Sequence, residues 1–287
     1  MDNPFAISSA SVQRRFDKAS ATFDSADFVH AATRDGLFTR LAPMLVDAKT
    51  VVDLGCATGK SIKPLANHFR GAKIIGVDAS AGMLERCRAR RYWFAKTSFV
   101  QADAQALPFP DGSVDVVFSN LMLHWVDDLP AVAREVARVL RKDGLFLFAT
   151  LGPDTFAALR NAWARVDSYP HVHGFADMHD VGDCLSRSGL RDPVLDVDHL
   201  TVTYRDIDKL LQELSAAGAR NALRHRYPGL MTPSRLASFR NNLAKEADDG
   251  DIAVGFEIVY GHCWGSGARS ADGNVRIDAG AIPVRRR

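Results

Sequence analysis

The sequence is poor in cysteine, and the cysteines that it has are not grouped into a site. They lie far apart, with no CxxC pair and no Cys/His spacing typical of zinc: Cys56, Cys87, Cys184 and Cys263. This spacing excludes a domain built on disulfide bonds and fits a reduced setting. We therefore expect a cytoplasmic protein.

The chain also has no long apolar run and almost no net charge. No stretch reaches the roughly 20 apolar residues of a membrane-spanning helix, and the start MDNPFAISSASVQRRF lacks the charged-then-apolar order of a secretory signal. A formal net charge of +2 shows no bias toward nucleic acid or an anionic membrane surface. We expect no membrane span and no nucleic-acid partner. A cleaved organelle presequence stays open, because the start contains arginine and serine.

Apolar residues, by contrast, are abundant and occur in short, regularly spaced runs. A chain of 287 residues with 47% hydrophobic content can bury one large α/β core or two small ones. The runs rich in β-branched residues are 50–54, 73–78, 98–103, 114–119 and 144–150. The helical patterns between them are 60–69, 80–91 and 129–140. This alternation predicts βαβ units in a doubly wound domain around a buried parallel sheet.

Helical patterns also flank this region. Apolar residues recur at helical spacing over 9–46, with a break expected at 24–27 and a weakened last turn at Pro43. After residue 150 the expected segments are, in order, a helix over 154–166, a helix ending near Gly189, a strand over 192–204, helices over 206–218 and 233–247, and a strand over 255–265.

These patterns divide the chain into three parts. We predict an N-terminal helical cap over 1–46 and a main domain over 47–264. Two helices between the last two strands exceed what a minimal connection needs, so a helical lid is expected at about 204–250. The Gly-, Ser- and Arg-rich segment 265–287 is predicted to be a flexible tail.

The stretch VVDLGCATGKSIKPLA, residues 51–66, predicts a strand, a glycine turn and a helix. Such a turn lets the backbone approach a ligand closely. It fails both phosphate-binding patterns, however. GxxxGKS is one residue short of a P-loop, and the dinucleotide fingerprint is broken by Ala57 and Lys60.

Acidic residues end three consecutive predicted strands. Asp53, Asp78 and Asp103 are therefore expected to face one crevice at the carboxyl ends of the sheet. Asp78 lies 19 positions after Gly59, which suits two ribose hydroxyls, and Asp103 could accept from the amine of adenine. Such a crevice repels pyrophosphate and favours a cationic nucleoside. The alternatives are a plain turn for the glycines, a helix cap for Asp78 and a turn residue for Asp103.

Four segments taken in order resemble the motifs of class I S-adenosylmethionine-dependent methyltransferases: DLGCATG, VDAS, ADAQALPFPDGSVDVVFSNLMLHWVDD and AREVARVLRKDGLFLFAT. The resemblance implies an α/β, Rossmann-like, doubly wound sheet of seven strands, mostly parallel with the last strand antiparallel. It also implies S-adenosyl-L-methionine as cofactor, S-adenosyl-L-homocysteine as product, and no metal.

The same resemblance assigns roles to residues. Asp53 and Gly55 would lie beside the amino acid moiety, and Asp78 would hold the ribose. Adenine would meet Asp103 and Ala104, and the methionyl part would be flanked by Asn120 and Leu121. The implied cofactor-binding set is Asp53, Gly55, Ala57, Gly59, Asp78, Ala79, Met83, Asp103, Ala104, Asn120 and Leu121.

Beyond this core the chain resembles, over nearly its whole length, the malonyl-carrier-protein O-methyltransferases of biotin synthesis. The segments that carry this likeness are RRFDKASATFD, LGPDTFAALRNAWARVD, DVDHLTVTYRD and FEIVYGHCWG. One departure is Phe23, where these enzymes usually carry tyrosine. Two alternatives stay open: a relative of the mitochondrial complex I assembly factor that modifies a protein arginine, and a non-catalytic assembly protein that keeps the cofactor pocket. A small-molecule methyltransferase matches less well after residue 150.

The implied acceptor is a carboxylate, which is ionised near pH 7 and needs no general base. We therefore assign no catalytic residue and expect positioning by His124 and Phe23. The alternative for His124 is a supporting role, and a metal site in PHVHGFADMH lacks acidic partners. The implied partner is malonyl-loaded acyl carrier protein. Candidate substrate or carrier contacts are Trp125, His171, His173, Arg220, Arg224 and Arg226.

Two basic clusters could dock an acidic carrier protein. One is ARNALRHR, which holds Arg220, Arg224 and Arg226. The other is ERCRARRYW, with Arg86, Arg88, Arg90 and Arg91. For each cluster a solvated helix face is the alternative.

Overall fold

The computed structural model describes residues 5–90, 92, 96–247 and 249–267. Within them one sheet has the strand order β3-β2-β1-β4-β5-β7-β6. The strands are β1 (Thr50–Leu54), β2 (Lys73–Asp78), β3 (Lys96–Gln101), β4 (Val114–Asn120), β5 (Leu140–Leu151), β6 (Leu190–Tyr204) and β7 (Ile252–Gly265). The first five pair in parallel, and β7 runs antiparallel to both of its neighbours. The predicted doubly wound sheet with an antiparallel last strand is confirmed.

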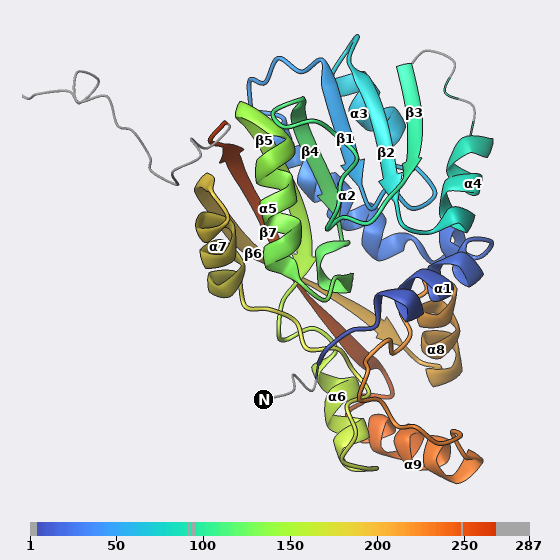
Figure 1. Ribbon diagram of the computed structural model, residues 1–287. Helices are drawn as coiled ribbons and strands as arrows, with labels where there is room; N and C mark the ends of the chain where they lie inside the picture. The colour runs from blue at the N-terminus through green and yellow to red at the C-terminus, as the bar shows by residue number, and fades with distance from the viewer. Residues whose placement is uncertain (1–4, 91, 93–95, 248, 268–287) are drawn as a thin grey trace, which may run out of the picture.

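Helices cover both faces of this sheet (Figure 1). The helices α2 (Phe28–Leu41), α3 (Ile62–His68) and α4 (Ala81–Ala89) pack on one face, and α5 (Leu129–Val139) and α7 (Met178–Arg187) pack on the other. Alternate strand residues face opposite sides, so Val116 and Phe118 enter one core while Val117 enters the other. Burial on both sides explains why the strands read as continuous apolar runs.

The N-terminal segment crosses the end of the sheet where β1, β2 and β4 terminate. It consists of α1 (Ser9–Ala19), the 3-10 helix η1 (Phe23–Ala26) and α2, so η1 occupies the predicted break. Asp17 of α1 accepts hydrogen bonds from Ser80 Oγ (2.6 Å) and Gly82 N (3.0 Å) at the start of α4. In Figure 1, α1 lies beside α4 and directly above α8. The assignment of residues 1–46 as an N-terminal helical cap stays a prediction.

The remaining helices gather beyond the same end of the sheet (Figure 1). They are η2 (Leu123–Trp125), α6 (Ala157–Ala164), α8 (Ile207–Ala216) and α9 (Pro233–Ala244). Helices α8 and α9 form the connection between β6 and β7, where a lid was predicted. Trp163 of α6 stacks on Phe239 of α9 at 4.2 Å between ring centroids. Helix α6 begins later than predicted, because Phe156 before it adopts φ 60°.

Two further predictions concern the C-terminal tail and membrane-spanning helices. The flexible tail predicted over 265–287 falls outside the described residues from 268 onward. Among the described helices, none combines the length and apolar character that a bilayer span requires.

The turn after β1 depends on glycine at two positions. Gly55 has φ 77° and Gly59 has φ 81°, both in the left-handed region. A Cβ on Gly55 would lie 2.5 Å from Met122 Cβ, and one on Gly59 would lie 2.3 Å from Cys87 Sγ and 2.4 Å from Tyr92 Oη. Close packing therefore adds to the backbone requirement at both glycines.

We expect Gly59→Ala to destabilise the protein more than Gly71→Ala. Gly71 has φ 86° but nothing within 4 Å of an added Cβ, so alanine there adds only backbone strain of about 1–2 kcal/mol. At Gly59 the clash should add about 1–3 kcal/mol to that strain. The measurement is urea denaturation of both variants. Equal losses would show that packing around Gly59 yields easily.

Candidate active site

A cavity lies at the carboxyl ends of β1, β2 and β4, roofed by α1 and η1. Its empty volume is about 1070 Å³, including space open to solvent. Many of the residues predicted from the sequence line it, namely Phe23, Gly55, Ala57, Asp78, Ala79, Asp103, Ala104, Asn120, Leu121 and Trp125. The apolar roof comes from Val12 and Phe16 of α1. We call this space the cofactor cavity.

Asp78 ends β2 and joins two loops at the wall of this cavity. Its Oδ2 accepts from Ala57 N (2.9 Å) and its Oδ1 from Ser80 N (2.8 Å). Burial raises the pKa of Asp78 to about 6 despite these bonds. Ser80 is the residue that caps α4, since its Oγ accepts from Met83 N at 3.1 Å. The cap alternative for Asp78 therefore does not hold, and its carboxylate remains beside the cavity.

Asp53 lies behind the turn and does not line the cavity. Its side chain is buried, and Oδ2 has no hydrogen-bond partner among the described residues. Burial raises the pKa of Asp53 to about 8, the charge of Asp78 adds to this, and Arg34 opposes it. The carboxyl is thus largely protonated near neutral pH, and a cation in the cavity would favour its ionisation.

Two other predicted residues also stand behind the cavity wall. Gly59 carries the turn, and its carbonyl accepts from Tyr92 Oη at 3.2 Å. Met83 is fully buried and packs with Phe23 and Ala19. Neither of them lines the cavity. Gly59 would affect a ligand only by shaping the turn, and Met83 only by supporting Phe23.

Asp103, by contrast, is exposed at the cavity edge. Its Oδ1 accepts from Gln105 N at 2.9 Å, which closes a local turn. The turn alternative and the adenine contact are therefore compatible, because a carboxylate has further acceptor positions.

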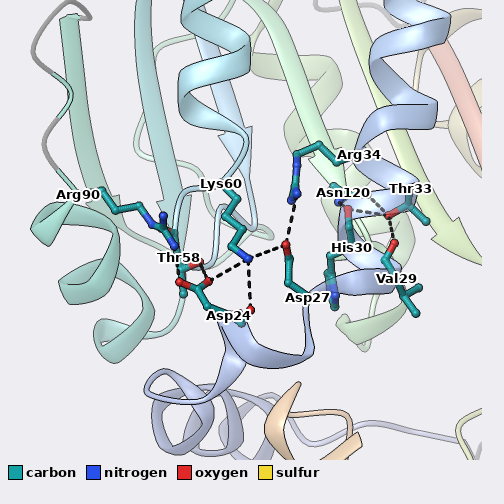
Figure 2. A network of polar contacts seen from close by, with 10 residues as sticks. All are labelled: Asp24, Asp27, Val29, His30, Thr33, Arg34, Thr58, Lys60, Arg90 and Asn120. Atoms are coloured by element: carbon teal, nitrogen blue, oxygen red, sulfur yellow. Dashed lines mark hydrogen bonds and ion pairs between the residues drawn. The ribbon is translucent and has the colours of Figure 1, made fainter. Parts of the chain in front are cut away.

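An ionic network ties η1 and α2 to the glycine turn (Figure 2). Asp27 accepts from Lys60 Nζ at 2.8 Å and from Arg34 at 3.3 Å, with only 8% of its side chain exposed. Asp24 accepts from Thr58 Oγ1 at 2.6 Å and also pairs with Arg90. The network holds the roof of the cofactor cavity onto its floor.

Asn120 anchors α2 from the end of β4 (Figure 2). Its Nδ2 donates to the carbonyl of His30 at 2.9 Å, and its Oδ1 accepts from Thr33 Oγ1 at 2.8 Å. Both ends of the amide are therefore engaged with α2. Asn120 still lines the cofactor cavity, so the predicted contact with a ligand would use atoms other than the two amide atoms bonded to α2. The amide itself fixes the position of His30.

A second cavity, with an empty volume of about 2060 Å³ including space open to solvent, lies between the sheet end and helices α6, α8 and α9. Its walls are mostly apolar and aromatic, including Phe156, Trp163, Phe175 and Phe256. It meets the cofactor cavity at three residues that line both, His30, Leu121 and Trp125. We call it the acceptor cavity. The two spaces are adjacent across the residue that follows β4.

His30 is a residue that the sequence analysis missed. Its Nδ1 is buried with no hydrogen-bond partner among the described residues, and burial lowers its pKa to about 4. The imidazole is therefore neutral near pH 7 and carries one N–H. The sequence around His30 shows only an apolar helical pattern. Its position depends on Asn120 at the end of β4, and no spacing rule in the sequence indicates that contact.

The predicted histidines differ in whether their ring nitrogens already have hydrogen-bond partners. His124 lines the acceptor cavity, its Nδ1 is also unpartnered among the described residues, and burial holds its pKa well below the usual value. His173 Nε2 already accepts from Ala222 N at 3.0 Å. His171 bonds Asp167 at 3.0 Å and stacks on Trp163 at 3.9 Å. His171 and His173 thus build the cavity wall.

The predicted arginine cluster is divided by the structure. Arg224 donates to Ile7 O (2.9 Å) and pairs with Asp127 (2.6 Å), which ties the N-terminal segment to the loop after η2. Arg220 and Arg226 instead line a separate opening next to α1. In the second cluster, Arg90 pairs with Asp24, and Arg91 lies outside the described residues. Arg86 and Arg88 are exposed on α4.

In the part of the chain that the structure describes, no group of three or more His, Cys, Asp or Glu side chains is placed to hold a metal ion. The four cysteines all lie in this part and are free.

Comparison with known proteins places the chain among methyltransferases. Residues 52–148 match the family model described as a methyltransferase domain. A malonyl-(acyl-carrier protein) O-methyltransferase from Halorhodospira halophila is 42% identical over 282 residues, which are 96% of each chain. One from Gallionella capsiferriformans is 37% identical over 268 residues, 91% of this chain and 92% of the relative. The crystal structure of YcgJ from Bacillus subtilis shares the fold, with TM-score 0.59, 20% identity and coverage of 81% and 98%.

We expect the ligand-free protein to lose stability as pH rises from about 5 to 9. The folded pKa values of Asp53 and Asp78, about 8 and about 6, exceed the ordinary value near 4, so the folded state binds more protons than the unfolded state in this window. Asp53→Asn should melt like the parent at pH 5 and several degrees higher at pH 9. The exposed Asp183→Asn is the control, and parallel curves for Asp53→Asn would contradict the burial argument.

Proposed function

Because the chain belongs to the family of malonyl-(acyl-carrier protein) O-methyltransferases, we propose that it methylates the free carboxylate of a malonyl thioester carried by acyl carrier protein. It is an S-adenosylmethionine-dependent methyltransferase. The methyl ester would remove a negative charge and let chain-elongating enzymes accept the product, as an early step of biotin synthesis. We place the reaction in the cytoplasm, in line with four free cysteines.

The observation that carries this proposal is the junction of the two cavities. A methyl donor in the cofactor cavity and a carboxylate in the acceptor cavity would meet beside Leu121, between His30 and Trp125. Direct displacement requires the two reacting groups to be held in line and close together, and adjacent binding spaces supply that alignment.

The residues of the cofactor cavity fit a cationic nucleoside. Asp78 presents its carboxylate at the wall, Asp103 stands at the edge, and Asp53 has an unpartnered buried oxygen behind the glycine turn. We assign Asp78 to the ribose hydroxyls, Asp103 with Ala104 to adenine, and Asp53 with Gly55 to the charged amino acid end. Phe16 and Phe23 would cover the bound molecule with apolar surface.

The acceptor cavity suits the chemistry without a general base. S-adenosylmethionine supplies, when bound, a methyl group whose carbon–sulfur bond breaks as a carboxylate oxygen bonds to the carbon, leaving a neutral thioether and a neutral ester. Because a cation and an anion are consumed together, the aromatic walls formed by Phe156, Phe175 and Phe256 do not oppose the reaction. The same walls exclude water.

Neutral histidines are the groups that would orient the acceptor. His30 lies at the junction and has an N–H to donate, and His124 stands close by in the same cavity. A neutral donor can hold one carboxylate oxygen without the full charge pairing that an arginine would impose on the nucleophile. His30 is therefore assigned to bind the carboxylate, with His124 as its neighbour in the wall.

We expect His30→Ala to lower kcat/KM by about 10- to 100-fold, since a hydrogen bond to a charged group contributes about 1.5–3 kcal/mol. Cofactor affinity should change little, and the wild-type rate should stay level between pH 6 and 8 because His30 titrates near 4. His30→Gln, which keeps a donor, should recover part of the loss, and the exposed His199→Ala is the control. A rate that rises with a pKa near 7 would instead indicate a general base.

The proposed function is tested by methyl transfer from labelled S-adenosylmethionine to malonyl-acyl carrier protein and malonyl-coenzyme A side by side. We expect a base-labile label on the malonyl group, formed faster on the carrier protein. Asp78→Ala is the matched inactive form, and its cofactor affinity should fall by about 1–3 kcal/mol in calorimetry. Cofactor binding without transfer to either thioester would overturn the acceptor assignment and direct the search to protein acceptors.

A further inference from the structure

A third opening lies between α1 and the segment that follows α8. Its empty volume is about 1240 Å³, including space open to solvent, and it is lined by five cationic side chains and no acidic one, the cations being Arg14, Arg15, Lys18, Arg220 and Arg226. We call it the basic groove. Three of its cations come from α1, and two come from the connection between β6 and β7.

The groove cations lack the acidic partners that many arginines have elsewhere in the described chain. Arg138, for example, pairs with Glu135 and Asp111. In the groove, Arg14 donates to Ser11 Oγ (3.2 Å) and Arg226 donates to Leu223 O (2.8 Å), and among the described residues none of the five forms an ion pair.

Crowding of like charge is evident at the centre of the groove. The pKa of Arg15 is lowered by burial and then by the charges of Arg226, Arg220 and Arg14. Like charges at close range raise the free energy of the ligand-free fold, and a bound anion would relieve the repulsion.

The walls of the groove are fixed in place. Thr22 Oγ1 donates to Ala216 O at 3.1 Å, and Gly218 packs against Phe16 so closely that a Cβ there would lie 3.1 Å from the ring. Both walls are thus held together by contacts other than the cations. The groove is a preformed concave surface and not a set of loose side chains.

The groove borders the acceptor cavity. Gln212, Ser215 and Arg220 line both spaces. A substrate that places its reacting carboxylate at the inner end of the acceptor cavity would therefore carry its outer part past Arg220 into the groove.

We propose that the basic groove binds the phosphate of the phosphopantetheine arm that carries the malonyl group. This inference rests on the proposed function, which places a malonyl thioester in the adjoining cavity. Arginine and lysine are the usual protein ligands of phosphate, and five converging cations in a concave site suit a compact anion. The phosphate is favoured over a broad acidic surface because the site is concave and Arg15, which the other arginines surround, is partly buried.

The test compares two small substrates that differ only in the phosphate, malonyl-phosphopantetheine and malonyl-pantetheine. Arg15→Gln/Arg226→Gln removes one unpaired cation from each wall without touching the acceptor cavity, and Arg86→Gln/Arg88→Gln removes two exposed charges from α4 as the control. We expect the groove variant to raise KM for the phosphorylated substrate at least tenfold and to leave KM for malonyl-pantetheine within twofold. The control should alter neither value, and the melting temperature of the groove variant should not fall.

Other outcomes would overturn the inference. An equal rise of KM on both substrates would make the groove structural, and a rise seen only with the intact carrier protein would assign it to the protein surface. Calorimetric titration with phosphopantetheine, which requires no turnover, should give binding to the wild type and at least tenfold weaker binding to the groove variant. No binding to the wild type would refute the phosphate site, whereas binding without methylation of any malonyl thioester would refute the proposed function alone.

Discussion

One buried carboxylate, that of Asp27, joins the start of α2 to the glycine turn below the cofactor cavity. It accepts from Lys60 on the glycine turn and from Arg34 on its own helix, with 8% of its side chain exposed. Lys60 and Arg34 both compensate this buried charge, so loss of either leaves the carboxylate with a single cationic partner. The roof of the cofactor cavity rests on this contact, since α1 and η1 contribute Phe16 and Phe23 to the lining. The binding space is therefore formed between the sheet and a segment that precedes it in the chain.

The sign of the charged side chains changes from the cofactor cavity, across the acceptor cavity, to the basic groove. Acidic groups, Asp53 and Asp78, stand at the cofactor end, neutral histidines stand at the junction, and unpaired cations stand at the outer opening. In the proposed reaction, the cationic donor would bind near the acidic groups and the anionic substrate near the cations. The junction between them is lined by neutral side chains. The apolar walls of the junction are consistent with a reaction in which both charges disappear.

Sequence reasoning predicted the sheet well, because its signals are local. The strands over 50–54 and 73–78 were predicted with the bounds that the structure has, and the acids at the strand ends follow from the same pattern. The number of strands and the antiparallel last strand came from the resemblance and not from periodicity. His30 and Lys60 escaped notice as site residues because their positions depend on partners far away in the sequence, Asn120 for one and Asp27 for the other. Arg224 was grouped with its neighbours in the chain, and a tertiary pair with Asp127 separates it from them.

The first described residues of the chain find their partners near its far end. Ile7 bridges to Leu223, Ser8 N donates to Ala222 O at 3.1 Å, and Arg224 N donates to Ala6 O at 2.8 Å. Proteins are made from the N-terminus onward, so Ile7 must wait for Leu223, which is synthesised 216 positions later (223 − 7). Such a contact of high sequence separation forms late and slowly. The roof of the site thus precedes the sheet in the chain and is among the last elements to take its place, so a nascent chain that still lacks residues 222–224 has no finished site.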